Sequence, residues 1–209
     1  MRHRIIFATG NEGKMREIRM ILADLGMEIL SMKEAGADPD IVEDGTTFAE
    51  NAEIKARAVW KCTGDIVLAD DSGLVVDYLD GEPGVYSARY MGEDTSYEIK
   101  NREIIHRLKG AGQQERTARF VSAIAAILPD GTVLHTEGTV EGVIAHEPAG
   151  TGGFGYDPIF YLPEYGKTSA EIPIEKKNEI SHRGKALEKM KIKLIEALQG
   201  ENHEDLDCQ

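Results

Sequence analysis

The sequence has few cysteines and no long apolar run. Its two cysteines, Cys62 and Cys208, lack the spacing of a metal site and offer no disulfide framework. No segment approaches the ~18 apolar residues of a membrane-spanning helix. The apolar stretch from Ile5 to Thr9 is too short for the core of a signal peptide. These absences favour a cytoplasmic location and argue against a membrane partner.

A surplus of basic residues is also missing. The formal net charge is -13, from 24 basic and 37 acidic side chains. Surfaces that bind nucleic acid gain affinity by neutralising phosphates with Lys and Arg, so a nucleic-acid partner is not expected. A polyanionic ligand would have to be held by a local positive site.

The chain contains no internal repeat, no low-complexity linker and no clear domain boundary. Its 209 residues, of which 41% are hydrophobic, can bury a substantial core. We therefore expect one domain over residues 1–199. The polar, acidic residues 200–209 are expected to form a flexible tail.

Strand and helix patterns alternate along the chain, which predicts an α/β fold. Thr47 and Glu50 have the spacing of a capping box at the start of a helix. The turn at 129–131 indicates a hairpin between two long strands. The predicted strands are 4–9, 27–32, 66–69, 119–128 and 132–144, and the predicted helices are 15–25, 47–64, 94–110 and 175–198.

Asp70 and Asp71 follow the apolar strand pattern 66–69, and apolar residues resume after Gly73. Adjacent carboxylates repel each other, and removing them from water is unfavourable unless a cation or hydrogen-bond donors compensate. A bound metal ion would explain the pair. A solvated turn would also explain it, because Asp, Ser and Gly are common turn residues.

The segment ATGNEGK, from Ala8 to Lys14, is a second candidate site. A Gly-containing loop between a strand and a helix directs backbone N–H groups and the positive helix end at one point, which suits a phosphate group. It is not a Walker A loop, because Met15 stands where Ser or Thr should follow the lysine. An ordinary tight turn is the alternative.

Three further groups carry chemistry only if the fold brings them together. Asn51 and Lys55 share one helix face, with Glu43 in the preceding loop, and a solvated face is the simplest interpretation. The segment 150–157 combines glycines with aromatic rings on which a base can stack, or it is a flexible loop with aromatic anchors. In the segment KKNEISHRGKAL, the histidine and arginine can equally be structural or solvated.

Taken together, these segments resemble the inosine/xanthosine triphosphate pyrophosphatases, which remove aberrant purine nucleoside triphosphates from the nucleotide pool. Enzymes of this family release the nucleoside monophosphate and pyrophosphate. The matching stretches occur in order between residues 8 and 187, and they are ATGNEGK, GTTFAENAEIKA, ADDSGL, PGVYSARY, GTGGFGYDPIF and ISHRGKAL.

The resemblance implies a role for each candidate residue. Asp71 would be the catalytic proton acceptor. The magnesium-binding carboxylates would be Glu43 and Asp71, with Asp70 supporting the metal shell. Phosphate binding would fall to Thr9, Gly10, Asn11, Glu12, Gly13, Lys14, Lys55 and Ser72. The base would be held by Phe154, Gly155, Tyr156, Asp157, Lys177, His182 and Arg183.

The resemblance also implies a long mixed central sheet flanked by helices, with two lobes around a substrate cleft. It further implies a homodimer and a Mg²⁺ cofactor, with Mn²⁺ as the alternative ion. The two aspartates would then form a metal site at the end of a strand, facing the phosphate loop.

Two other classes of protein compete with this interpretation. A nucleotide-binding regulator without turnover would need the phosphate loop and the base pocket, but not the acidic cluster. A phosphatase of the haloacid dehalogenase type carries two aspartates one residue apart, whereas Asp70 and Asp71 are adjacent. That class would also leave the glycine-aromatic segment without a role.

Overall fold

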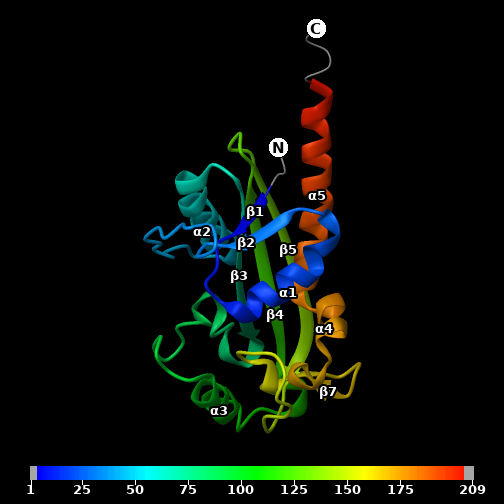
Figure 1. The fold of residues 1–209 in the computed structure, drawn as a ribbon. Helices are drawn as coiled ribbons and strands as arrows, with labels where there is room; N and C mark the ends of the chain where they lie inside the picture. The colour runs from blue at the N-terminus through cyan, green and yellow to red at the C-terminus, as the bar shows by residue number, and fades with distance from the viewer. Residues whose placement is uncertain (1–3, 205–209) are drawn as a thin grey trace.

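The computed structural model describes residues 4–204, and these form one mixed sheet with helices on both faces (Figure 1). The strand order is β2-β1-β3-β4-β5-β6-β7. Strands β2, β1 and β3 run parallel, and all other neighbours are antiparallel. Their bounds are β1 Arg4–Phe7, β2 Glu28–Ser31, β3 Ile66–Val76, β4 Thr117–Ile127, β5 Val133–Ile144, β6 Phe160–Leu162 and β7 Lys167–Thr168.

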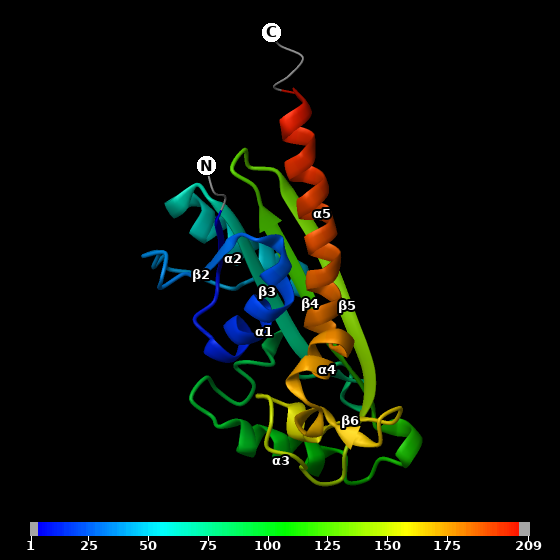
Figure 2. The same ribbon diagram turned by 45° about the vertical axis from the view of Figure 1, so that its right-hand side comes forward.

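The helices divide between the two faces of this sheet. Helix α2 (Phe48–Thr63) packs against β3 and β4. Helix α5 (His182–Glu204) packs against β4 and β5 and contacts α1 (Glu12–Leu22), and Figure 2 shows it running along these strands. The shorter helices are α3 (Tyr97–Arg107) and α4 (Ile174–Ile180). The expectation of a long mixed sheet flanked by helices is thereby confirmed.

Strand β3 separates two hydrophobic cores by simple alternation. Ile66 and Leu68 belong to the core shared with α1 and α5. Val67 and Ala69 belong to the core shared with α2. Since successive side chains of a strand point to opposite faces, even-numbered residues of β3 face α1 and α5, and odd-numbered residues face α2.

A third core lies at the other end of the long strands, where α3 and the residues around β6 pack (Figure 1). It includes Leu74 of β3, Phe120 of β4 and Ile144 of β5, together with Ile104 of α3. The same three strands therefore run from one lobe into the other.

The two largest differences from the predicted boundaries lie in β3 and in the last predicted helix. Strand β3 does not end at residue 69, because Asp70 and Asp71 pair with Ile124 and Ala123 of β4 and the strand continues to Val76. The predicted helix 175–198 is two helices, separated by Ser181 in an extended conformation with φ -70° and ψ 159°. The apolar periodicity alone does not reveal this break.

Other predicted features match the structure. The Thr47 and Glu50 capping box is present, and the hairpin closes with Leu128 N–H donating to Thr132 O at 2.9 Å. Helix α3 begins at Tyr97 after a Ser96 cap, slightly later than expected. The backbone of α5 continues to Glu204, and the end of the predicted tail, 205–209, lies outside the described residues.

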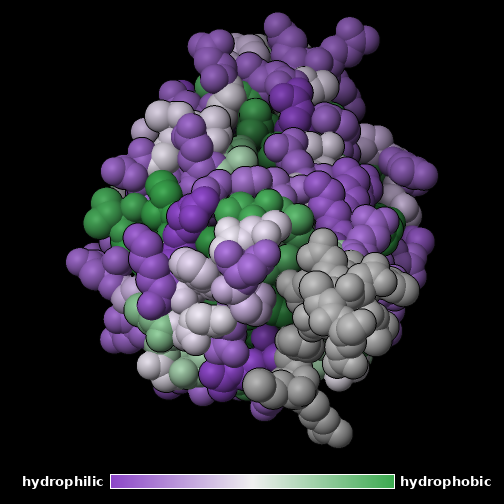
Figure 3. Space-filling view, turned by 90° about the horizontal axis from the view of Figure 1, so that it is seen from above, coloured by the Kyte–Doolittle hydropathy of each residue, from purple (hydrophilic) through white to green (hydrophobic). Residues whose placement is uncertain are grey.

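The surface agrees with the charged composition. Seen from the end at which α5 finishes, hydrophilic residues cover most of the molecule, and hydrophobic residues form separate patches (Figure 3). Within residues 4–204, none of the helices combines the length and the apolar character that crossing a membrane requires.

Candidate active site

A cleft of about 320 Å³ brings the predicted site residues together from both lobes. It is lined by Thr9, Gly10, Asn11, Lys14, Glu43, Lys55, Asp70, Asp71, Ser72, Phe154, Gly155, Tyr156, Asp157, Lys177, His182 and Arg183. Glu12 and Gly13 lie in the first turn of α1 and do not line it. The roles assigned to all these residues remain predictions, but their convergence in one cleft is a fact of the fold.

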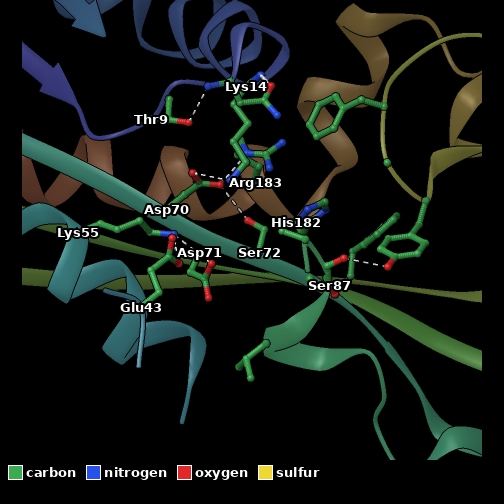
Figure 4. A pocket seen from close by; sticks show the side chains of 18 of the residues that line it. Thr9, Lys14, Glu43, Lys55, Asp70, Asp71, Ser72, Ser87, His182 and Arg183 are labelled. Atoms are coloured by element: carbon green, nitrogen blue, oxygen red, sulfur yellow. Dashed lines mark hydrogen bonds and ion pairs between the residues drawn. The ribbon is translucent and has the colours of Figure 1, made fainter. Parts of the chain in front are cut away.

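The phosphate-loop candidate enters α1 through a well-formed cap. The Asn11 side chain accepts a hydrogen bond from Lys14 N–H at 3.0 Å, and Thr9 Oγ1 accepts one from Asn11 N–H at 3.2 Å. These contacts hold the loop so that the N-terminal end of α1 opens towards the cleft (Figure 4). The positive end of this helix and the Lys14 ammonium both suit an anionic group.

The even-numbered face of β3 carries Asp70 between two cations (Figure 4). Lys14 Nζ lies 3.0 Å from Asp70 Oδ1, and Arg183 Nε lies 3.2 Å from Asp70 Oδ2. Burial alone would raise the pKa of Asp70, but the charges of Lys14 and Arg183 hold it far below its ordinary value. Asp70 is therefore ionised at neutral pH, and each of its oxygens is paired with a cation.

The odd-numbered face carries Asp71, which meets a different set of groups. Lys55 Nζ lies 3.1 Å from Asp71 Oδ1 and 2.8 Å from Glu43 Oε2, and Asn51 Nδ2 donates to Asp71 Oδ2 at 3.3 Å. Burial raises the pKa of Asp71, and the Glu43 charge acts in the same direction against the opposing effect of Lys55. A raised pKa makes the carboxylate a stronger base.

Ser72 and Ser122 complete the even-numbered face on neighbouring strands. Ser72 Oγ lies 2.9 Å from Asp70 Oδ2 and 2.9 Å from Ser122 Oγ, which stands opposite it in the sheet. Its hydroxyl thus lies beside the carboxylate that holds Lys14.

The base-binding candidates lie against the start of α1. Asp157 Oδ2 accepts hydrogen bonds from Phe154 N–H and Lys177 Nζ, both at 2.8 Å. The Phe154 ring lies 5.0 Å from Lys177 Nζ and 5.5 Å from the Arg183 guanidinium carbon. A Cβ at Gly13 would come within 3.2 Å of the same ring, so a glycine there allows the loop to approach the helix.

Tyr156 and His182 are buried, so neither ring is freely exposed for a base to stack on. The Tyr156 hydroxyl donates to Ser87 O at 2.8 Å, and only 3% of the residue is exposed. The His182 ring stacks on Phe120 with centroids 4.8 Å apart. Burial, aided by the Arg183 charge, lowers the pKa of His182 well below its ordinary value, so the imidazole is neutral at pH 7.

Glu17 is a site residue that sequence reasoning missed. It is 4% exposed, and its carboxylate accepts from Lys177 Nζ at 3.0 Å and from Arg183 Nη1 at 2.5 Å. It thereby joins α1 to α4 and α5. Glu17 lies one turn after Lys14 on the same helix, which could have indicated that it faces the site. The charged residues around it in the sequence instead favour a solvated helix face.

The segment 83–90 is a second omission, although it is the motif PGVYSARY. A Cβ at Gly73 would come within 2.4 Å of Gly84 O, so glycine lets this segment lie directly on β3. There Ser87 Oγ accepts from Leu74 N–H at 2.9 Å. Arg89 lines the cleft and donates to Glu43 O at 3.1 Å; among residues 4–204 no carboxylate forms an ion pair with it.

The donor set on the Asp71 face fits magnesium. Among the described residues there is no group of three or more His, Cys, Asp or Glu side chains that could hold a metal ion. Mg²⁺, however, keeps several waters and commonly takes only one or two protein carboxylates together with phosphate oxygens. Glu43 and Asp71 supply such a pair of oxygen ligands, and both line the cleft.

Comparison with known proteins gives one consistent family. The Ham1 family model matches residues 5–193. A dITP/XTP pyrophosphatase of Desulforamulus reducens is 50% identical over 186 residues, covering 89% of this chain and 92% of the relative.

The solved structures agree with this match. A HAM1 protein from Coxiella burnetii aligns with a TM-score of 0.84 and 42% identity, covering 93% of this chain and 99% of that chain. The Staphylococcus aureus Ham1 protein aligns with a TM-score of 0.82 and 40% identity over the same shares of the two chains.

Proposed function

Because this chain belongs to the Ham1 family, we propose that it hydrolyses non-canonical purine nucleoside triphosphates, among them ITP, dITP and XTP, to the monophosphate and pyrophosphate. It is then a hydrolase of nucleotide metabolism with a small-molecule nucleotide substrate. The observation that carries the proposal is a cleft in which the N-terminus of α1, two phosphate-binding lysine candidates and two metal-binding carboxylate candidates face the base-binding residues.

We propose Mg²⁺ as the cofactor, held by Glu43 and Asp71, with Mn²⁺ as an alternative. When bound, the divalent ion neutralises phosphate charge and lowers the pKa of a bound water. Asp70, on the other face of β3, supports the arrangement by holding Lys14 and Arg183.

The chain's own residues then do the following. Asp71 accepts a proton from the water that attacks the α-phosphorus, and the bond from that phosphorus to the bridging oxygen of pyrophosphate breaks. Lys14, Lys55 and the N–H groups at the start of α1 stabilise the negative charge of the departing pyrophosphate. The nucleoside monophosphate remains as the second product.

The base would lie at the end of the cleft formed by Phe154, Tyr156 and Asp157. Hypoxanthine and xanthine carry an acceptor oxygen at position 6, where adenine carries a donor. Arg183 is our candidate for the cationic donor that favours the oxygen, with His182 as the second candidate. The neutral His182 imidazole and the buried Arg183 guanidinium both line this part of the cleft.

We further infer a homodimer in the cytoplasm. Exposed apolar side chains such as Val42, Tyr86 and Ile99, each more than half exposed, could be covered by a second subunit. Cys62 is a free thiol, which suits a reducing compartment. Light scattering coupled to size-exclusion chromatography tests the dimer.

One assay tests the proposed function directly. The purified protein is incubated with ITP, XTP, dITP, ATP and GTP in the presence of Mg²⁺, and the products are separated. Pyrophosphate and a monophosphate from the non-canonical purines are the expected result. Inorganic phosphate would favour a phosphatase and no product a regulator, although the phosphatase alternative is already weakened because Asp70 and Asp71 face opposite sides of β3.

A further inference from the structure

We propose that Lys55 is an internal counter-ion that keeps the affinity of Glu43 and Asp71 for a divalent ion low until a nucleotide arrives. The phosphates of the nucleotide then give the ammonium a new partner, so metal and nucleotide bind with strong positive coupling. This inference deepens the proposed function and rests on it.

The geometry places the ammonium between the two metal-ligand candidates. Lys55 Nζ contacts one oxygen of each carboxylate, at 2.8 Å to Glu43 Oε2 and 3.1 Å to Asp71 Oδ1, and Figure 4 shows the side chain reaching the pair from α2. The Lys55 side chain is 11% exposed and that of Asp71 is 12% exposed. Water therefore screens the Lys55–Asp71 pair less than it would at the surface, whereas the side chain of Glu43 is 30% exposed.

In the part of the chain that the structure describes, no second cation forms an ion pair with these two carboxylates. Within residues 4–204, every ion pair of Glu43 or Asp71 is made with Lys55. Lys14, the other phosphate-binding candidate, is engaged by Asp70 on the opposite face of β3. Arg89 also lines the cleft, but it donates to the backbone oxygen of Glu43. The positive charge in direct contact with the carboxylate oxygens of Glu43 and Asp71 is therefore that of Lys55.

An ammonium group and a divalent ion at the same two carboxylates repel each other, whether or not they share the same oxygens. The lysine must therefore weaken metal binding as long as it stays. Its flexible four-carbon stem lets the ammonium move to a phosphate oxygen in the cleft, which Lys55 lines together with Lys14. Such a movement relieves the repulsion only when nucleotide is present.

An alternative role predicts the opposite sign. If Lys55 only holds Glu43 and Asp71 in place for the metal, its removal would disorder the two ligands and weaken metal binding. The two roles can therefore be separated by the direction of one change in affinity.

The test is a titration of the full chain with Mn²⁺, followed by electron paramagnetic resonance of the free ion. It compares wild type, Lys55→Met, Lys55→Arg and the control Lys61→Met, which removes an exposed lysine from the last turn of the same helix. We expect Lys55→Met to bind Mn²⁺ at least ~10-fold more tightly than wild type. Lys55→Arg, which keeps the charge, and Lys61→Met should stay close to wild type.

The same titrations are repeated with an inosine triphosphate analogue that carries a methylene group between the α- and β-phosphorus atoms and cannot be cleaved there. In wild type the analogue should raise the affinity for Mn²⁺ by a larger factor than in Lys55→Met. The affinity of the analogue itself for Mn²⁺ cancels in the ratio of these two factors. If Lys55→Met unfolds, the comparison passes to Lys55→Gln, with circular dichroism as the check on folding.

Unchanged or weaker Mn²⁺ binding in the folded Lys55→Met or Lys55→Gln protein would overturn the proposal, as would equal coupling factors in wild type and variant. Turnover of the nucleotide panel by wild type is measured separately. If wild type releases pyrophosphate while the titrations contradict the counter-ion role, only this inference fails. If wild type cleaves no nucleotide, the proposed function fails, and this inference with it.

Discussion

The two faces of β3 place the adjacent residues Asp70 and Asp71 in opposite electrostatic environments. On the even-numbered face, Asp70 is shared by two cations, Lys14 and Arg183. On the odd-numbered face, one cation, Lys55, serves two carboxylates. The first arrangement is electrostatically satisfied and stabilises the fold, while the second retains excess negative charge and is suited to bind a cation and accept a proton.

The largest expected difference between the faces is in turnover. Asp71→Asn should fold normally but lose nearly all activity, because general-base assistance alone typically contributes ~100- to 10,000-fold. Steady-state kinetics with ITP and Mg²⁺, together with circular dichroism, provide the measurement. Near-normal turnover would show that Asp71 is not the catalytic base. The odd-numbered face of β3 would then not be the catalytic one.

The next largest effect is on the free energy of unfolding, and it concerns Asp70 on the even-numbered face. Asp70→Asn leaves the buried charges of Lys14 and Arg183 underpaired, which should lower the free energy of unfolding by ~3–5 kcal/mol in urea denaturation at pH 7. The exposed pair of Glu98 and Arg102 provides the control, since Glu98→Gln should cost at most ~0.5 kcal/mol.

The pH dependence of this loss has a definite sign. The folded-state pKa of Asp70 lies below its ordinary value of 3.8, so its contribution is fully present above that value and is lost as the pH falls through the folded pKa. The gap between wild type and Asp70→Asn should therefore persist at neutral pH and shrink only in strong acid. A gap that vanished between pH 7 and 5 would contradict the assignment.

Substitutions of Arg183, which pairs with Asp70 on the even-numbered face, and of Phe154, whose ring Arg183 contacts, should differ in their effect on discrimination between bases. Arg183→Ala should lower kcat/KM for ITP more than for ATP and compress their ratio by ~5- to 150-fold, the worth of one mismatched polar contact. Phe154→Ala should lower both values by similar factors, because every base has a π-face. An unchanged ITP-to-ATP ratio in Arg183→Ala would indicate that the discriminating contact lies elsewhere, most simply in the backbone around Asp157.

The smallest expected effect is a gain in stability. The folded-state pKa of Asp71 is raised, so its ionisation opposes folding as the pH rises through that pKa. Asp71→Asn should raise the free energy of unfolding by the order of 1 kcal/mol at pH 7, a typical exchange of activity for stability. The gain should disappear below the ordinary Asp pKa of 3.8, and thermal unfolding in metal-free buffer at both pH values measures it.

The sequence predicted the α/β class, the capping box and 16 of the 26 residues that line the cleft. It could do so because those features are local: a Thr and a Glu three residues apart, or a glycine-containing loop before a helix. The assignment of roles came from the resemblance of the motifs to a family and not from spacing.

What the sequence did not predict depends on contacts between distant segments. A strand that continues through Asp70 and Asp71 looks like a turn until β4 provides the paired backbone and α1, α2 and α5 provide the cations. Glu17 looks solvated until Lys177 and Arg183, about 160 residues away, fold against it. Ser181 interrupts a helix whose apolar periodicity continues on either side.

The alternation of β3 also restricts which changes of chain length the molecule can tolerate. Side chains of a strand repeat every two residues, so an insertion or deletion of one residue between Ile66 and Leu68 would carry both aspartates across the sheet. An insertion would move Asp70 to the position beside Lys55 and carry Asp71 on to the position of Ser72. A deletion would move Asp71 to the position beside Lys14 and Arg183 and carry Asp70 back to the position of Ala69. Either change would leave one of the two environments without its carboxylate. In this stretch of the chain, length polymorphism should therefore be confined to steps of two.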